Sequence, residues 1–143
     1  MPTGSCWCGE VKYEYSGEPT MKVICHCLTC HKTGGGTHTV SALVPSTSFR
    51  VISGTPKAFT KQHESGMMLT INFCSTCGST LWKKGDVGPL RELAIVEVGT
   101  LDDLGVLDGL RPQAELYTCY RAKWLGELEG TVQNKEVENT FQK

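Results

Sequence analysis

Seven of the eight cysteines in this sequence of 143 residues fall into three close groups. The groups are Cys6-Trp7-Cys8, Cys25-His26-Cys27-Leu28-Thr29-Cys30 and Cys74-Ser75-Thr76-Cys77-Gly78. Thiolates one or two residues apart converge on one metal ion when the chain turns tightly, and the glycines that follow two of the groups allow such a turn. Because soft thiolate ligands favour zinc, the pattern predicts a zinc protein with reduced cysteines.

The expected compartment agrees with reduced thiols. The N-terminal residues show no basic segment followed by an apolar stretch, so we expect no secretory signal and a cytoplasmic location. No apolar run approaches the ~20 residues that a bilayer-spanning helix needs, so a membrane protein is not expected. The 14 basic and 15 acidic side chains are balanced and scattered, which argues against nucleic acid as a partner. The length predicts a single zinc-binding domain over residues 1–143.

Short runs of alternating apolar and polar residues predict a mainly β fold. The predicted strands cover residues 11–15, 40–44, 49–51, 69–73, 93–98 and 116–120. Turn sequences at 53–56, 64–66 and 83–89 separate several of them, so consecutive strands are expected to be antiparallel neighbours. One helical turn is predicted at 101–104, ended by Gly105, and the chain from about Gln133 is expected to fray.

Spacing alone leaves two divisions of the seven cysteines open. In one, the two pairs form a closed four-thiolate site, and the triplet forms a second site with a position open to water or substrate. In the other, Cys27 and Cys30 join Cys74 and Cys77 as a zinc ribbon. Cys119 stands apart from the groups and is expected to be a buried core residue.

The sequence around the cysteines resembles the glutathione-dependent formaldehyde-activating enzyme family, which includes the centromere protein V-like domain. The resemblance covers residues 4–13, 25–32 and 73–81, followed in the family's order by residues 98–102 and 121–124. It implies a β-tent fold of stacked antiparallel sheets and two zinc ions per chain. The implied ligands are Cys6, Cys8, Cys74 and Cys77 for a structural zinc, and Cys25, Cys27 and Cys30 for a catalytic zinc.

The resemblance also implies an activity. Members condense glutathione with formaldehyde to S-hydroxymethylglutathione, so the expected function is that of a carbon–sulfur lyase acting on a small thiol–carbonyl adduct. Two alternatives stay open: an enzyme of this fold that acts on another small metabolite, such as an imine or a thiol adduct, and a non-catalytic zinc-stapled module that binds another protein. Chromatin association is not expected because a basic region is missing. An exposed edge strand would allow a homodimer.

Several other residues have interpretations of their own. Glu115 stands where many members of the family carry a histidine, so no role of that histidine can be transferred to this chain. Neighbours of metal ligands point away from the metal in an extended chain, and His26 is therefore expected at the surface. His31 and His63 are expected to be exposed, with acid–base chemistry as the alternative. Lys32 is expected to be an exposed, solvated side chain, with attraction of an anionic substrate as the alternative. Trp82 and Trp124 are expected to be packing residues.

Overall fold

Two β-sheets form the framework of the described part of the chain, residues 1–136, in this computed structural model. The small sheet has three strands in the order β1-β2-β5, and the large sheet has eight in the order β11-β10-β3-β4-β9-β8-β7-β6. The prediction of a mainly β fold built from sheets is confirmed, and the structure shows that the sheets are two. Within the same residues, no helix is long and apolar enough to cross a bilayer.

The elements follow one another along the chain with short connections. The small sheet consists of β1 (Thr3–Ser5), β2 (Lys12–Tyr15) and β5 (Phe49–Ser53). The large sheet consists of β3 (Met21–Cys25), β4 (Thr39–Pro45), β6 (Lys57–Gln62), β7 (Met68–Phe73), β8 (Thr80–Gly85), β9 (Leu93–Glu97), β10 (Ala114–Leu116) and β11 (Val132–Gln133). The helices are α1 (Leu28–Gly34), α2 (Leu104–Asp108) and the short 3-10 helices Ser46–Ser48, Gly88–Glu92, Val98–Thr100 and Thr118–Tyr120.

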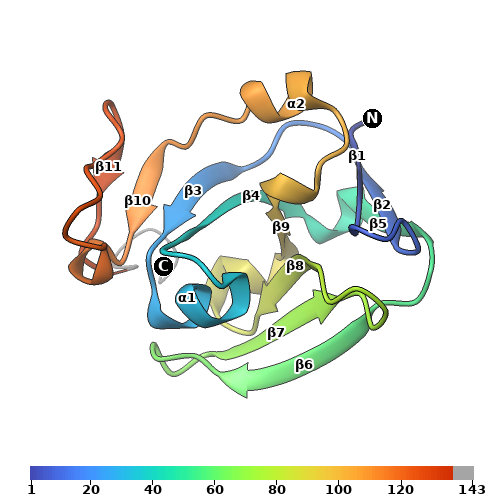
Figure 1. Cartoon of the computed structure of the whole chain (residues 1–143), viewed down its shortest axis with the longest axis horizontal. Coiled ribbons are helices and arrows are strands. Elements are labelled where there is room, and N and C mark those ends of the chain that lie inside the picture. The colour runs from blue at the N-terminus through green and yellow to red at the C-terminus, as the bar shows by residue number, and fades with distance from the viewer. Residues whose placement is uncertain (137–143) are drawn as a thin grey trace.

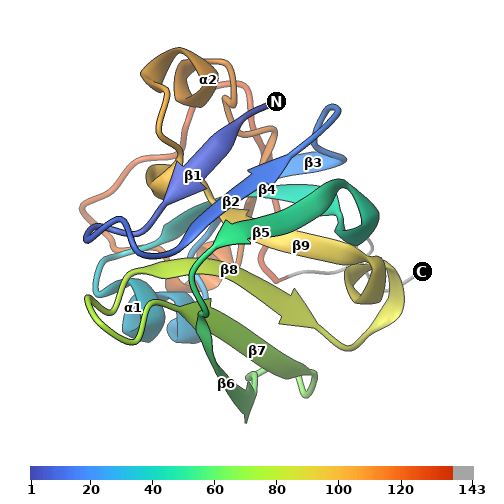
Figure 2. The ribbon, with the colours of Figure 1, turned by 90° about the vertical axis from the view of Figure 1, so that its right-hand side faces the viewer.

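Most neighbouring strands are antiparallel, as predicted for those joined at 64–66 and 83–89. The turn at 53–56 instead joins β5 to β6, which lie in different sheets, so these two consecutive strands are not neighbours. The exception to antiparallel pairing is β10, which is parallel to both β3 and β11. Between β9 and β10 the chain passes through α2, so β10 joins the far side of the sheet without a hairpin. Figure 1 shows the large sheet curving around α1, and Figure 2 shows the small sheet lying over β4 and β9.

Three local predictions are wrong. The strand predicted at 116–120 ends at Leu116, because Tyr117 has a φ of 55° and a 3-10 helix follows. Gly105 lies in the first turn of α2 rather than ending a helix, since the N-cap Asp103 side chain accepts a hydrogen bond from its N–H at 2.8 Å. The turn predicted at 83–89 begins too early, because residues 83–85 belong to β8. Of the tail that was expected to fray, Gln133 lies in β11, and residues 137–143 lie outside the described residues, so this expectation stays a prediction.

Alternate residues of the central strands face two separate apolar cores. On one face of the large sheet, Val44 and Val96 pack with Tyr13 of the small sheet. On the other face, Leu43 and Ile95 belong to an apolar cluster that surrounds Cys25, Cys27 and Cys30. Both faces are therefore covered, which explains why β4 is apolar along most of its length. Trp82 packs against Phe49 at a ring distance of 4.8 Å, as predicted.

Candidate functional site

The first cysteine cluster joins a turn of the small sheet to a turn of the large sheet. Cys6 and Cys8 lie between β1 and β2, and Cys74 and Cys77 lie between β7 and β8. The Sγ of Cys8 is 3.6 Å from that of Cys6 and 3.7 Å from that of Cys74, and all four sulfurs lie within 4.8 Å of one another. Sulfurs placed tetrahedrally around zinc at ~2.3 Å are about 3.8 Å apart. The observed cluster therefore fits a zinc ion with little rearrangement.

Both turns depend on a glycine in the left-handed backbone region. Gly9 has a φ of 82° and donates its N–H to the carbonyl oxygen of Cys6 at 3.0 Å. Gly78 has a φ of 80° and donates to the carbonyl oxygen of Cys74 at 2.8 Å. A residue with a Cβ rarely adopts this conformation, so the glycines allow the tight turns that bring each pair of sulfurs together.

A hydroxyl group favours the thiolate form within this cluster. The Oγ of Ser79 lies 3.3 Å from the Sγ of Cys77, and this hydrogen bond lowers the pKa of Cys77 to about 5. Cys77 is therefore deprotonated at neutral pH, as a metal ligand must be.

The second cluster lies where β3 meets α1. Cys25 is the last residue of β3, Cys27 precedes α1 as its N-cap, and Cys30 lies in the first turn of the helix. The Sγ of Cys27 accepts a hydrogen bond from the N–H of Cys30 at 3.2 Å, and the three sulfurs lie within 4.8 Å of one another. Because the three cysteines lie at the strand end, at the helix cap and in the first helical turn, their sulfur atoms come close together. The described residues thus group the cysteines as four and three, and not as a ribbon.

A buried lysine faces the three-cysteine cluster, although its sequence context predicts a turn. Lys83 of β8 is 3% exposed, and its Nζ lies 3.4 Å from the Sγ of Cys30 and 2.9 Å from Oε1 of Glu97. Burial by itself would lower the pKa of Lys83, but the negative charges of Glu97 and Cys30 raise it above its ordinary value. The lysine is therefore charged and stabilises negative charge in the cluster.

Cys30 is the cysteine of this cluster whose thiolate receives the most support. Hydrogen bonds from the thiols of Cys25 and Cys27 lower its pKa, and the charge of Lys83 lowers it further. The hydroxyl of Thr39 also donates to its Sγ at 3.1 Å. The cluster thus holds a thiolate at neutral pH even before a metal ion is considered.

A cavity of about 70 Å³ lies beside the three cysteines. Its polar lining includes Lys83, Thr39 and His63, and the rest of its wall is mostly apolar, with Val23, Leu43, Leu90, Ile95 and Leu116. The three sulfurs therefore face a small, mostly apolar space in which a small reacting group can meet them. The four-cysteine cluster does not line this cavity.

The connection between β6 and β7 closes one side of the cavity. His63 was expected at the surface, but it is buried, and its Nδ1 accepts a hydrogen bond from the N–H of Ser65 at 3.0 Å. Its Nε2 lies 2.7 Å from Oε1 of Glu64, which also accepts from the N–H and hydroxyl of Thr29 at 3.3 and 3.0 Å. Burial lowers the pKa of His63, so the ring is neutral at pH 7. Glu64 thus fastens the connection to the start of α1.

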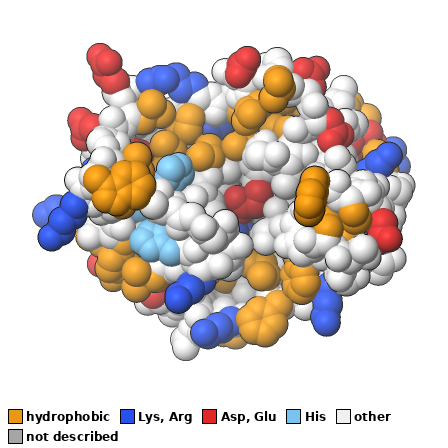
Figure 3. All heavy atoms as spheres, in the orientation of Figure 1, with side chains coloured by type: hydrophobic (Ala, Val, Ile, Leu, Met, Phe, Trp, Pro, Cys, Tyr) orange, Lys and Arg blue, Asp and Glu red, His pale blue; other side chains and the backbone are white. Residues whose placement is uncertain are grey.

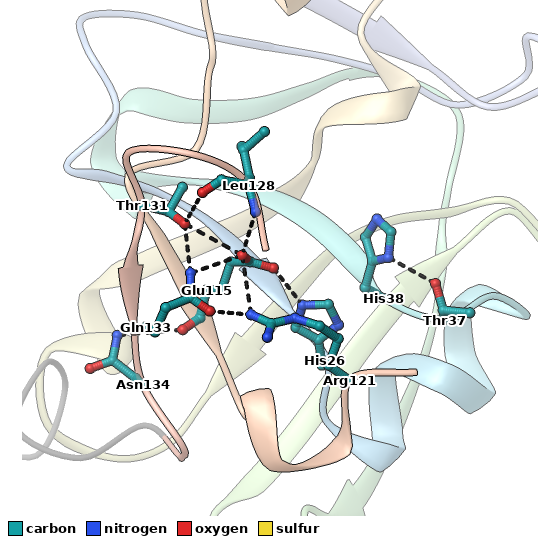
Figure 4. Close-up of polar contacts among 9 residues, drawn as sticks. All are labelled: His26, Thr37, His38, Glu115, Arg121, Leu128, Thr131, Gln133 and Asn134. Atoms are coloured by element: carbon teal, nitrogen blue, oxygen red, sulfur yellow. Dashed lines mark hydrogen bonds and ion pairs between the residues drawn. The ribbon is translucent and has the colours of Figure 1, made fainter. Parts of the chain in front are cut away.

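Behind the triplet, His26 and Glu115 form a buried pair (Figure 4). His26 is 0% exposed, and its Nε2 lies 2.7 Å from Oε1 of Glu115. The other carboxylate oxygen accepts from the N–H of Leu128 and from Nε2 of Gln133, both at 2.9 Å, and lies 3.2 Å from Arg121. Burial would raise the pKa of Glu115, but these partners lower it to about 2. Because a carboxylate only accepts, Nε2 of His26 carries the hydrogen.

The predicted surface position of His26 is therefore wrong. Its side chain does not line the cavity beside the three cysteines but lies against Glu115, within the segment of residues 114–134 (Figure 4). In the sequence, the only signal related to this pair is that Glu115 stands where many family members carry a histidine. That signal does not show that His26 is the partner of Glu115.

The remaining interpretations have mixed outcomes. Cys119 is exposed in the 3-10 helix after Tyr117, so its prediction as a core residue is wrong. Trp124 is exposed and does not fill the packing role expected of it. His31 is half-buried, and Lys32 is exposed as expected. None of these residues lines the three-cysteine cavity.

Comparison with known proteins supports the resemblance seen in the sequence. The family model for the glutathione-dependent formaldehyde-activating enzyme matches residues 1–120, which include all seven clustered cysteines. A search of curated proteins found no match. A Rhodobacter sphaeroides protein solved by structural genomics is similar in fold, with a TM-score of 0.58 and 22% identity over 77% of this chain and 96% of that chain. The chain belongs to the glutathione-dependent formaldehyde-activating enzyme family.

Proposed function

We propose that this chain is a zinc-dependent enzyme of the carbon–sulfur lyase type, which joins a small thiol to a carbonyl compound or releases both from their adduct. Glutathione and formaldehyde, which combine to S-hydroxymethylglutathione, are the proposed pair, and the family's name supports them. The observation that carries the proposal is the cluster of Cys25, Cys27 and Cys30, which faces a cavity and, among the residues that the structure describes, has no fourth sulfur.

The donor sets of the two clusters suit zinc in two different roles. Four sulfurs at tetrahedral spacing make a closed site, which would hold the turns of the two sheets together. Three sulfurs leave one coordination position free. When bound there, zinc supplies a Lewis acid that takes a thiol as thiolate or polarises a carbonyl oxygen. We therefore propose two zinc ions per chain, one structural and one catalytic.

Charge balance in the three-cysteine cluster favours a mild reaction. Three thiolates outweigh the charge of one zinc ion by one negative unit, which weakens the site as a Lewis acid and suits thiol addition better than hydrolysis. The ammonium group of Lys83 opposes this negative charge from 3.4 Å. It has three N–H donors, and Glu97 and Cys30 engage two of them. The third is available to an oxygen that gains negative charge in the cavity.

The overall reaction forms one carbon–sulfur bond. The sulfur of the thiol adds to the carbonyl carbon, the carbon–oxygen double bond becomes a single bond, and the thiol proton ends on the oxygen. No oxidant or reductant is needed. The cavity of about 70 Å³ accommodates the reacting carbon and sulfur, while the remainder of a larger thiol stays outside. Its apolar walls keep water away and strengthen the electrostatic effect of Lys83.

Substitution of Cys27 by serine tests the proposal. In zinc-loaded protein, Cys27→Ser should abolish the conversion of glutathione and formaldehyde to the adduct, followed by NMR, while circular dichroism shows an intact fold. Cys119→Ser is the matched control because Cys119 is exposed and belongs to neither cluster. Unchanged turnover in the Cys27 variant would refute the proposed role.

Metal content separates the enzyme from a non-catalytic module. The proposal requires two zinc ions per purified chain, of which Cys27→Ser removes one. A protein that only binds a partner needs the four-cysteine site alone. A single zinc ion in the unmodified chain would therefore favour a binding module over the enzyme.

A further inference from the structure

One face of the large sheet extends from the three-cysteine cavity out to β6. Strand pairing sets Phe59 of β6 opposite Ile71 of β7, Ile71 opposite Lys83 of β8, and Lys83 opposite Ile95 of β9. Residues opposite each other in neighbouring strands project from the same face. Phe59 and Ile71 therefore share a face with the lysine that contacts Cys30.

The outer part of this face forms a groove with α1. The groove has a volume of about 760 Å³, within the roughly 300–1,000 Å³ of small-molecule sites. Its apolar lining comprises Leu28, Phe59, Leu69, Ile71 and Phe73. Phe59 is 56% exposed, so a large aromatic ring is left facing solvent. Contiguous exposed apolar surface next to a reactive cavity indicates a binding surface.

The charges in the groove favour an anionic ligand. Lys32 of α1 and Lys61 of β6 line it, and Glu64 is the carboxylate among its described lining residues. Oε1 of Glu64 is already engaged by His63 and Thr29, whereas both lysines are exposed. Figure 3 shows basic side chains beside hydrophobic ones along the lower margin of this face, where Figure 1 places β6 and β7.

The groove and the three-cysteine cavity are neighbours. His63 and Leu69 line both of them, so the two spaces meet at the connection between β6 and β7. His63 and Leu69 thus form the wall that a short reactive arm of a ligand in the groove has to pass to reach the cluster. The small inner cavity limits the size of that arm, and the larger groove admits a body of many atoms.

We infer that the groove binds the body of the substrate, and that this substrate is a carboxylate-bearing thiol, or its aldehyde adduct, with an apolar segment. The apolar segment lies on Phe59 and Phe73, the carboxylate meets Lys61 and Lys32, and the sulfur enters the cavity. The inference rests on the proposed function and adds the substrate class. Glutathione supplies the carboxylates but no large apolar side chain, so it uses only part of this surface.

Three matched thiols separate these contributions. The probe 2-benzyl-3-mercaptopropanoate carries a ring, a carboxylate and a thiol, 3-mercaptopropanoate lacks the ring, and 3-phenylpropane-1-thiol lacks the carboxylate. Titration calorimetry on the zinc-loaded protein gives the three dissociation constants. We expect the benzyl compound to bind at least tenfold more tightly than either of the others. Equal affinity for the benzyl compound and 3-mercaptopropanoate would overturn the inference.

Two substitutions locate the effect in the groove. Phe59→Ser should reduce the benzyl preference, which is the affinity for the benzyl compound relative to 3-mercaptopropanoate, to less than threefold. The affinity for 3-mercaptopropanoate itself should stay unchanged. Lys61→Glu should weaken the binding of both carboxylate-bearing thiols and leave the affinity for 3-phenylpropane-1-thiol unchanged. The control is Ile52→Ser on β5, because Ile52 is a comparably exposed apolar residue, at 43%, in the small sheet. A benzyl preference that survives Phe59→Ser would place the apolar segment elsewhere and overturn the inference.

Other outcomes distinguish this inference from the proposed function. If no thiol binds to the zinc-loaded protein, the proposed function fails and the inference fails with it. If 3-mercaptopropanoate binds but the ring adds nothing, only the inference fails. Sedimentation of the protein alone provides a further test, since a dimer that Phe59→Ser dissociates would assign the groove to a second copy of the chain and overturn the inference.

Discussion

Replacing Glu115 with glutamine tests whether this buried carboxylate anchors the loop of the three-cysteine cluster. Its Oε1 accepts from His26, and its Oε2 accepts from Leu128 and Gln133 and pairs with Arg121. Glutamine has nearly the same shape but one accepting oxygen. Its NH₂ group would face either the donors on the Oε2 side or Nε2 of His26, whose hydrogen would then have to move to Nδ1, a buried atom without a hydrogen-bond partner among the described residues. Glu115→Gln therefore leaves buried donors unpaired and removes the charge that faces Arg121.

The expected loss follows from the pKa of Glu115, which falls from an ordinary 4.5 to about 2 in the folded chain. At ~1.4 kcal/mol per pKa unit, the ionised form adds about 3 kcal/mol to the free energy of unfolding at pH 7. Because the folded-state pKa is the lower one, this contribution is complete above pH 4.5 and is lost as the pH falls through 2. At pH 3, about 1 kcal/mol of this contribution to the free energy of unfolding remains.

Urea unfolding of the wild type and the variant at pH 7 and pH 3 measures this difference. The variant should be less stable by about 3 kcal/mol at pH 7, and the difference should shrink to about 1 kcal/mol at pH 3. Chelator competition should also show weaker zinc binding, because His26 lies between Cys25 and Cys27. Glu127→Gln is the control, an exposed carboxylate on the same segment. A loss below about 1 kcal/mol at pH 7, or one independent of pH, would refute the reasoning.

Three further expectations concern other parts of the molecule. Cys74→Ser should lower the zinc content by one ion per chain and lower Tm, because the link between the two sheets is lost; unchanged zinc by elemental analysis contradicts this. Lys83→Met should reduce the free energy of unfolding by about 3–5 kcal/mol, since Glu97 stays buried without a partner. Adding Glu97→Gln should recover most of that loss, and no recovery argues against the pairing. Cys119→Ser should change stability by less than ~0.5 kcal/mol, and in the zinc-loaded wild type Cys119 alone should react rapidly with a thiol reagent; labelling of a second cysteine contradicts this.

Local features of the molecule were predictable from the sequence alone. The mainly β fold follows from alternating runs such as residues 69–73, and the family follows from the cysteine motifs. Gly9 and Gly78 could be assigned to tight turns because a cysteine pair directly precedes each of them. These features depend on residues within a few positions of one another, where chain geometry restricts the possible structures.

The partners of the buried charged and polar residues were decided by the tertiary structure. The sequence around Lys83 predicts a turn, yet strand pairing and burial place Lys83 between Glu97 and Cys30. His26 is buried against Glu115, a partner that is 89 positions further along the chain. A charged or polar side chain is buried only where the fold supplies a partner, and a partner distant in sequence leaves no periodic signal. The sequence therefore determined the fold class and the cysteine motifs, whereas only the packed sheets determined how the seven cysteines divide and which charges surround the three-cysteine cluster.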